Sequence, residues 1–218
     1  MQLTRERIIT AAIELIEREG VDAVSMRRIA AELGSGVMSL YNHVPSKSVL
    51  LDGVAERVMS GIDLTTEPGA SWEDQVRAQV RAFRQIGRAC PRCMMVVVSR
   101  PANSEAVLRP MEHALATLRD AGIGAEDAVR VLRTFVAYVV GSLLREVGVS
   151  PGLEPRRPLT QDPSVLAADI PLPVNQAEFP RVVSMSAELL QRDHEADFEF
   201  GLELLVRAVA DLRPARTS

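Results

Sequence analysis

The stretch SMRRIAAELGSGVMSLYNHV, residues 25–44, contains two short helical patterns separated by a turn. Ser25 is a typical N-cap for the first helix, and the glycines at 34 and 36 supply the turn. Helical spacing places the apolar side chains of both helices on a common inner face: Ile29, Leu33, Leu40 and Val44. The pattern is typical of a helix–turn–helix, whose second helix enters the major groove of DNA. A plain structural hairpin of two helices has the same pattern, so the pattern by itself leaves both interpretations open.

The second helix of this unit, predicted over about 37–44, has an outer face suited to contact with bases. Its outward side chains are Val37, Met38, Ser39, Tyr41, Asn42 and His43. Arg27 and Arg28 at the start of the first helix, and Lys47 just beyond the second, add flanking positive charge. Because phosphate contacts position a protein on DNA while groove contacts read the sequence, this arrangement favours a DNA-binding surface.

Helical spacing continues through almost the whole chain, and no run alternates apolar and polar residues between turn signals. We therefore predict an all-α fold. Beyond the two helices of the turn unit, the helices are expected over about 4–20, 46–62, 71–89, 104–121, 125–147, 176–192 and 195–212. A short apolar stretch covers 94–98, and residues 150–174, with six prolines, predict a long surface connection.

The composition is that of a globular protein. The chain has 218 residues, of which 47% are hydrophobic and 25% charged, so it can bury a core and is not broadly disordered. The longest strongly apolar run, 134–144, lies between two arginines and is far shorter than the roughly 20 residues of a membrane-spanning helix. The polar N-terminus has no signal-peptide pattern. We therefore expect a soluble cytoplasmic protein with no membrane partner.

Charge is distributed unevenly along the chain. The net charge is −4, yet residues 1–48 carry six basic and six acidic side chains, so the later residues account for the whole excess of acid. Bulk charge is therefore not the basis of any nucleic-acid binding, and local contacts would have to supply it.

The residues that enzymes and metal sites require are scarce. The three histidines are at 43, 113 and 194, and there is no glycine-rich phosphate loop and no nucleophile motif. We expect no enzymatic activity, no metal and no other cofactor. Cys90-Pro-Arg-Cys93 is a single Cys-x-x-Cys pair, which leaves a thiol-based sensor as an alternative to two ordinary thiols. A helical adaptor that binds no DNA is the remaining rival function.

Residues 5–59 resemble the DNA-binding domain of the tetracycline-repressor family of bacterial regulators. The resemblance rests on residues 25–34, on the stretch SLYNHV at 39–44, on Lys47 and on LLD at 50–52. Later stretches resemble the branch closest to the tetracycline repressor: SWE at 71–73, Arg100-Pro101, 118–122, Tyr138 with Gly141, and 197–202. The resemblance implies a three-helix DNA-binding domain over 1–48 and a helical regulatory, ligand-binding and dimerisation domain over 49–218. It also implies a repressor that a small molecule releases from a palindromic operator.

The resemblance assigns roles to the residues around the turn. Arg27 would reach a base edge or a phosphate, Tyr41 and His43 would contact the DNA backbone, and Lys47 would bind a phosphate. The base-reading positions are occupied by Met38, Ser39 and Asn42. Val37 departs from the family, which often has a polar side chain there, and Tyr41 could instead pack on the domain core.

A symmetric dimer is expected, because two half-sites about one helical turn apart need two copies of the reading helix. The strongly apolar helix 125–147 and the last helix 195–212 could form a four-helix bundle with their symmetry mates, as in the family, unless both simply form the monomer core.

A ligand pocket among the helices of 71–147 is a further implication of the resemblance. The candidate lining residues are Gln79, Phe83, Met94, Met95, Arg100, Met111, His113, Phe135 and Tyr138. The methionines could equally be core residues, and His113 a surface or satisfied core residue. The family's metal-binding histidine corresponds to Val96 here, so a magnesium–tetracycline effector is not expected and the effector is unknown.

Overall fold

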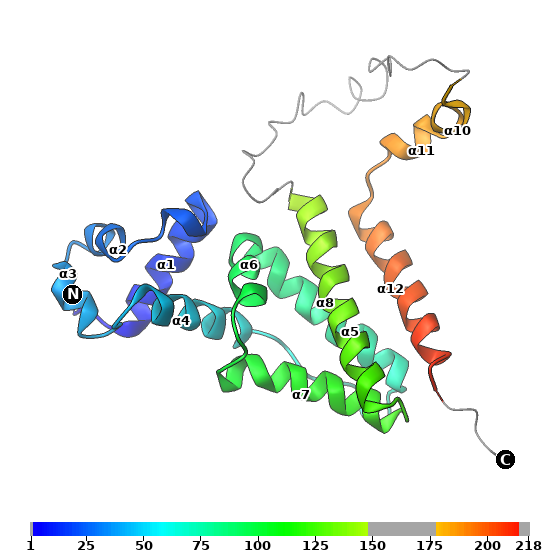
Figure 1. The fold of residues 1–218 in the computed structure, drawn as a ribbon, viewed down its shortest axis with the longest axis horizontal. Coiled ribbons are helices and arrows are strands. Elements are labelled where there is room, and N and C mark those ends of the chain that lie inside the picture. The colour runs from blue at the N-terminus through cyan, green and yellow to red at the C-terminus, as the bar shows by residue number, and fades with distance from the viewer. Residues whose placement is uncertain (1, 148–177, 214–218) are drawn as a thin grey trace.

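The computed structural model describes residues 2–147 and 178–213, and every regular element in those ranges is a helix (Figure 1). The all-α prediction is confirmed. The N-terminal elements are α1 (Arg5–Glu19), the 3-10 turn η1 (Val21–Ala23), α2 (Met26–Glu32), α3 (Val37–Tyr41) and α4 (Lys47–Met59). They are followed by α5 (Trp72–Ala89), α6 (Pro91–Ser99), α7 (Glu105–Asp120), α8 (Ala125–Val147), α10 (Pro180–Ser184), α11 (Ser186–Leu190) and α12 (His194–Ala210).

Four of these helices begin at the capping residues that the sequence indicates. The hydroxyl oxygens of Thr4, Ser25, Ser46 and Ser71 each accept a hydrogen bond from the backbone N–H three residues later, at 3.1–3.3 Å. These bonds satisfy N–H groups that the first turn of a helix leaves without a partner. The predicted starts of α1, α2, α4 and α5 are therefore confirmed.

Three predicted elements differ from the structure. The helix expected to reach Val44 ends at Tyr41, because Pro45 disfavours helical backbone in the residue before it. Residues 91–99 form a full helix, α6, where only an apolar stretch was predicted, since a proline is compatible with the first position of a helix.

The single helix expected over 176–192 is also different. Within the described part of that range two short helices are present, and the first begins at Pro180, which cannot donate an interior helix bond. The proline-rich stretch 150–174 lies outside the described residues.

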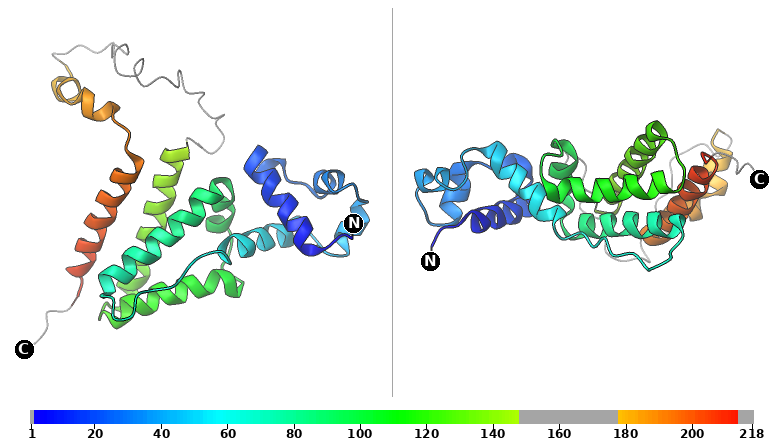
Figure 2. Two further views of the ribbon diagram at one scale, coloured as in Figure 1. Left: turned by 180° about the vertical axis from the view of Figure 1, so that it is seen from behind. Right: turned by 90° about the horizontal axis from the view of Figure 1, so that it is seen from below.

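The helix α4 connects the two halves of the fold. It packs on α1 within the N-terminal unit and on α6 and α7 of the C-terminal unit. The helix pair α2–α3 lies at one end of the elongated molecule and α12 at the other, as the two views of Figure 2 show. The C-terminal unit is built from α5, α7 and α8, with α12 packed against α5 and α8. The C-terminal end of α4 therefore lies close to α7, and the N-terminal end of the same helix lies close to α3.

Candidate nucleic-acid interface and internal cavity

The turn between α2 and α3 depends on Gly34. Its φ of +61° lies in the left-handed region that favours glycine. The N–H of Ser35 donates to the carbonyl oxygen of Ala30 at 3.0 Å, which closes the end of α2. Gly36 is then the N-cap of α3 and provides no side-chain hydrogen bond. The backbone around these two glycines sets the direction in which α3 leaves the turn.

The α3 helix has a buried face and an exposed face. Leu40 and Val44 are fully buried together with Ile29 of α2. On the opposite side Met38 is 76% exposed, and Ser39, Asn42 and His43 are exposed as well. A large apolar side chain as exposed as Met38 is available for contact with another molecule, such as a thymine methyl group.

The burial of the side chains on α3 bears on two of the predicted DNA-binding residues, Val37 and Tyr41. Val37 is half-buried and packs against the core, so only part of its side chain is available on the outer face. Its small apolar side chain fits this position because α3 packs on α2. Tyr41 is 40% exposed and is not among the residues that pack on the core, so the alternative of a core role for Tyr41 is not supported.

The flanking cations fall into two groups. The side chains of Arg27 and Lys47 are exposed, and neither makes an ion pair or hydrogen bond with any residue that the structure describes. Arg28, by contrast, donates to Glu19 at 2.7 Å and lies 3.7 Å from Glu32. Arg27 and Lys47 therefore remain available for phosphates, whereas Arg28 is already engaged within the domain.

A cavity of about 100 Å³, partly open to solvent, lies between α5, α7, α8 and the C-terminal end of α4. Its lining residues come from four parts of the chain. The end of α4 and the segment after it contribute Met59, Ile62 and Leu64, and α5 contributes Val76, Gln79, Val80 and Phe83. The other wall is formed by Pro110, Met111, Ala114 and Leu118 of α7 and by Leu132, Phe135, Val136 and Val139 of α8. The cavity is a concave, apolar site of the kind that holds small molecules.

The structure brings together four of the nine predicted ligand residues around this cavity: Gln79, Phe83, Met111 and Phe135. The lining also includes residues that sequence reasoning missed, at the end of α4 and on α5, α7 and α8. Leu132, Phe135, Val136 and Val139 follow the i, i+3, i+4, i+7 spacing of one helix face, which was a visible signal. No comparable signal connects Met59 with that face.

The remaining five predicted ligand residues lie away from the cavity lining. Met94 and Met95 pack toward the C-terminal part of α8, and half-buried His113 lines a groove on another face of α7. Tyr138 stacks on Phe198 of α12 with ring centroids 5.5 Å apart, and its hydroxyl donates to the carbonyl oxygen of Phe198 at 2.7 Å. His113 and Tyr138 are next to lining residues in sequence, but helix rotation turns their side chains toward other neighbours.

Arg100, the fifth of these residues, connects the end of α6 to α4. Its Nε donates to Asp52 Oδ1 at 2.5 Å, and its Nη2 donates to Ser48 Oγ at 2.6 Å. At the other end of α6 the Glu17 carboxylate of α1 accepts from the backbone N–H of Cys93 at 2.8 Å. Polar contacts therefore hold both ends of α6 to the N-terminal unit.

The Cys90–Cys93 pair does not have the character of a reactive site. Burial, reinforced by the nearby Glu17 carboxylate, raises the pKa of both thiols, and Cys93 is fully buried. Because the thiolate is the reactive form, a raised pKa disfavours thiol-based sensing.

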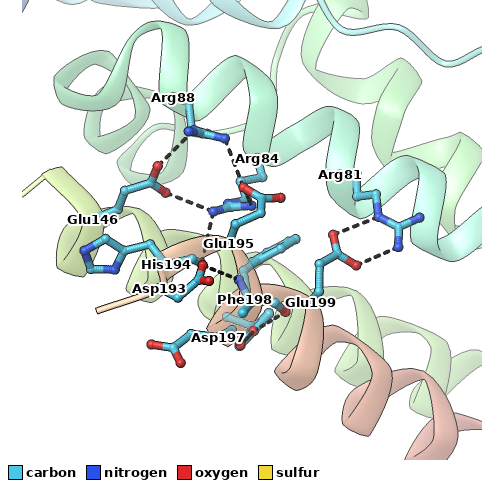
Figure 3. Close-up of polar contacts among 12 residues, drawn as sticks. Arg81, Arg84, Arg88, Glu146, Asp193, His194, Glu195, Asp197, Phe198 and Glu199 are labelled. Atoms are coloured by element: carbon cyan, nitrogen blue, oxygen red, sulfur yellow. Dashed lines mark hydrogen bonds and ion pairs between the residues drawn. The ribbon is translucent and has the colours of Figure 1, made fainter. Parts of the chain in front are cut away.

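The inner face of α12 is joined to the rest of the C-terminal unit by a row of ion pairs (Figure 3). Arg81 of α5 makes two hydrogen bonds to Glu199, at 2.9 and 2.6 Å, and Arg77 pairs in the same way with Glu203 at 2.7 and 3.0 Å. Buried Arg84 lies 2.9 Å from a Glu195 oxygen. These contacts fix which face of α12 points toward α5.

The outer face of α12 exposes two large apolar side chains. Phe200 is 69% exposed and Leu204 is 51% exposed. On the neighbouring helix α8, Ala137 and Gly141 are also exposed, and such small side chains allow another helix to approach closely. Bulky exposed apolar residues beside small ones are typical of a surface that packs on a protein partner.

The fold and these surfaces define a helix–turn–helix regulator with an internal cavity in its second unit. Residues 8–54 match the family of bacterial regulatory proteins known as the tetR family, and residues 65–212 match the tetracycline repressor-like C-terminal domain. The chain belongs to the tetracycline-repressor family of transcription regulators. Members of this family are not enzymes, so the enzymatic alternative is excluded.

Known relatives and structures agree with this assignment. The transcriptional repressor DrrR1 of Streptomyces coeruleorubidus is 31% identical over 208 residues, which cover 94% of this chain and 76% of that protein. The class A tetracycline repressor protein from transposon 1721 in Escherichia coli is 32% identical over 154 residues, covering 66% and 68%. The structure of ActR from Streptomyces coelicolor in complex with actinorhodin has a TM-score of 0.78 and 27% identity, covering 97% and 98%.

Within residues 2–147 and 178–213 no helix combines the length and the hydropathy needed to cross a membrane.

Proposed function

We propose that this protein is a cytoplasmic repressor that binds a palindromic operator as a homodimer and is released by a small molecule. The observation that carries the proposal is the exposed face of α3, which contains no acidic residue and lies beside two cations, Arg27 and Lys47, that have no partner among the described residues. The proposed DNA-binding unit is 1–48, and 49–218 forms the regulatory, ligand-binding and dimerisation unit. Ligand-bound ActR supports the regulatory part of the proposal.

In this proposal α3 lies in the major groove. Met38, Ser39 and Asn42 meet base edges, and Asn42 can pair with adenine through two hydrogen bonds, at about 1–3 kcal/mol of discrimination. The other contacts are to the DNA backbone: Arg27, Tyr41, His43 and Lys47. Val37 supports α3 from within rather than reading bases, since it is half-buried.

The dimer forms through α8 and α12. The exposed side chains Phe200 and Leu204 and the exposed small residues of α8 support this interface, because a monomer would leave them in water. The ion pairs between α5 and α12 hold the inner face of α12, so its outer face is free to meet the second copy. Two copies then present two α3 helices to half-sites about one helical turn apart.

Release from DNA works through α4. A ligand in the cavity packs against α5 and displaces Met59 at the end of α4, and the movement of α4 changes the separation of the two α3 helices. The ligand must prefer the released state: a shift from 1:99 to 99:1 requires about a 10⁴-fold preference, or roughly 5.5 kcal/mol.

Selection of binding sites from a random duplex pool tests the DNA-binding part. The expected product is an inverted repeat whose half-sites are about 10 base pairs, or a multiple, apart. Lys47→Ala should weaken binding across all selected sequences and reduce the salt dependence by about one phosphate contact. Arg57→Ala is the matched control, since Arg57 is an exposed cation further along α4. Failure to retain any duplex at low salt would instead favour a helical adaptor.

Sedimentation in solution tests the dimer. Phe200→Glu should convert the dimer to a monomer and abolish operator binding, because it places a charge in a buried apolar contact. A wild-type protein that stays monomeric at working concentration would contradict the proposal.

A further inference from the structure

The lining of the cavity is almost entirely apolar. Among the lining residues that the structure describes, Gln79 is the single polar one, and none carries a charge. Phe83 and Phe135 contribute aromatic rings, and the remaining lining side chains are aliphatic or thioether groups. An apolar ligand can therefore make favourable contacts along the whole wall, but the wall offers just one position for a hydrogen bond.

The hydrogen bonds around Gln79 determine whether its side chain offers a donor or an acceptor to a ligand. The hydroxyl of Thr117 lies 3.1 Å from the carbonyl oxygen of His113 and 3.4 Å from the amide oxygen of Gln75, and both of these atoms can only accept. Thr117 directs its proton to one of them and accepts from Gln79, whose Nε2 lies 2.8 Å from Oγ1. This orientation leaves Gln79 Oε1 as an acceptor with no partner among the described residues. A ligand that brings an O–H or N–H to this oxygen satisfies it.

Charged ligands are disfavoured by the same wall. An ion buried without a partner costs far more than a neutral group, and no lining side chain is an acid, a base, an imidazole or a thiol. One amide oxygen is also too few ligands for a bound magnesium ion, which takes octahedral oxygen coordination.

Beside the end of α4, the surface next to the cavity carries no unpaired charge among the described residues. A groove of about 350 Å³ adjoins it and shares Met59, Ile62, Leu64 and Pro110 with its lining. The charged side chains of this groove are already paired: Glu56 with Arg5 at 3.3 Å, and Glu105 with Arg109.

We propose that the effector is an uncharged, largely apolar ring molecule with one hydrogen-bond donor, bound without a metal ion and anchored to Gln79 Oε1. Calling it the effector rests on the proposed function, whereas its chemistry rests on the cavity. At about 100 Å³ the cavity is smaller than the roughly 150 Å³ apolar cavity known to hold benzene, so a larger ligand has to move the wall. The flexible side chains Met59 and Met111 are the parts that can yield, and Met59 is the last residue of α4.

Calorimetry at pH 7 with three two-ring probes tests this chemistry on the full-length protein. The probes are 2-naphthol, naphthalene and 2-naphthoate, which have one ring system but differ in hydrogen bonding and charge. The expected order is 2-naphthol, then naphthalene about fivefold weaker through the loss of one neutral hydrogen bond, then 2-naphthoate at least a hundredfold weaker than 2-naphthol. Addition of Mg²⁺ should leave every affinity unchanged.

A variant separates the hydrogen bond from the apolar contact. Gln79→Met should bind 2-naphthol and naphthalene equally while keeping the affinity for naphthalene within about twofold. Gln85→Met, an exposed glutamine on the same helix, should retain the fivefold difference. Should Gln79→Met fail to fold, the wild-type order of the three probes still decides the proposal.

Several results would overturn it. Equal affinity for 2-naphthoate and 2-naphthol, dependence on Mg²⁺, or no binding of any probe would each refute the proposed ligand class. Release of DNA is measured separately by a gel shift with selected duplex. Binding of 2-naphthol in the expected order without release of that duplex would refute the proposed mechanism while leaving the chemistry of the cavity intact.

Discussion

Replacing Arg84 by methionine is expected to destabilise the protein by about 2–3 kcal/mol, because Arg84 is the most deeply buried charge in the row between α5 and α12. Its side chain is 4% exposed, and its guanidinium lies 3.1 Å from Glu146 and 2.9 Å from Glu195. It also lies 4.0 Å above the ring of Phe198, which is fully buried. Methionine keeps much of the volume and the contact with the ring but removes the charge.

The magnitude follows from what each partner loses. Breaking a buried ion pair by removing one member typically costs about 3–5 kcal/mol, because the other charge is left buried. Glu146 is 16% exposed but keeps Arg88 as a second partner at 2.9 Å, and Glu195 is 59% exposed and can turn to water. These two facts reduce the expected cost to about 2–3 kcal/mol. For a chain of this length that corresponds to a decrease in Tm of about 4–12 °C.

Urea unfolding followed by circular dichroism, at one fixed protein concentration, measures this cost. Arg88→Met is the matched control: it removes a cation of the same cluster whose side chain is 52% exposed, so its loss should cost less than about 1 kcal/mol. A cost below about 0.5 kcal/mol for Arg84→Met, or a larger cost for Arg88→Met, would refute the reasoning that burial decides the strength of this contact.

Three further predictions concern pH, the turn and the thiols. Hydrogen bonds from arginines of α5 lower the pKa of Glu199 and Glu203, so their stabilisation is present above about pH 4.3, the ordinary pKa of an unfolded glutamate, and is lost as the pH falls. Acid unfolding monitored by circular dichroism should therefore show lower stability below about pH 4, and an unchanged stability there would contradict it. Gly34→Ala should cost about 1–2 kcal/mol in urea unfolding and weaken DNA binding, because alanine is strained at positive φ, whereas Gly124→Ala, which has open space and no positive φ, should cost less and leave DNA binding unchanged. Native Cys93 should resist alkylation by iodoacetamide at pH 7 and react in urea, as judged by mass spectrometry; rapid labelling of the folded protein would show that the thiol is accessible.

The family and the general plan of the fold could be inferred from the sequence by itself. The N-caps at Ser25, Ser46 and Ser71, and the glycine at 34, act through hydrogen bonds and dihedral angles within a few residues. Because these effects are local, they are visible in a linear pattern and predicted where most helices begin. The motif at 39–44 with Lys47 then gave the correct family, which the comparisons confirm.

Local patterns were less informative where a neighbouring element decides the outcome. Val37 has the spacing of an outward residue, yet its contact with the core makes it half-buried. Residues 91–99 begin with a proline that looks like a break, yet Glu17 from the distant helix α1 accepts from the N–H of Cys93 and completes the first turn of α6. Neither contact is encoded in the spacing of the residues concerned.

The composition of the cavity was decided by the tertiary structure. Met59 and Val139 lie 80 positions apart in the sequence and line the same cavity, while Tyr138, next to Val139, faces α12 instead. A helix turns by about 100° per residue, so neighbours in sequence meet different neighbours in space, and which one reaches the cavity depends on how the helices pack. The sequence by itself therefore determined the class of protein and the ends of its helices, and only the packing of those helices decided which side chains surround the cavity.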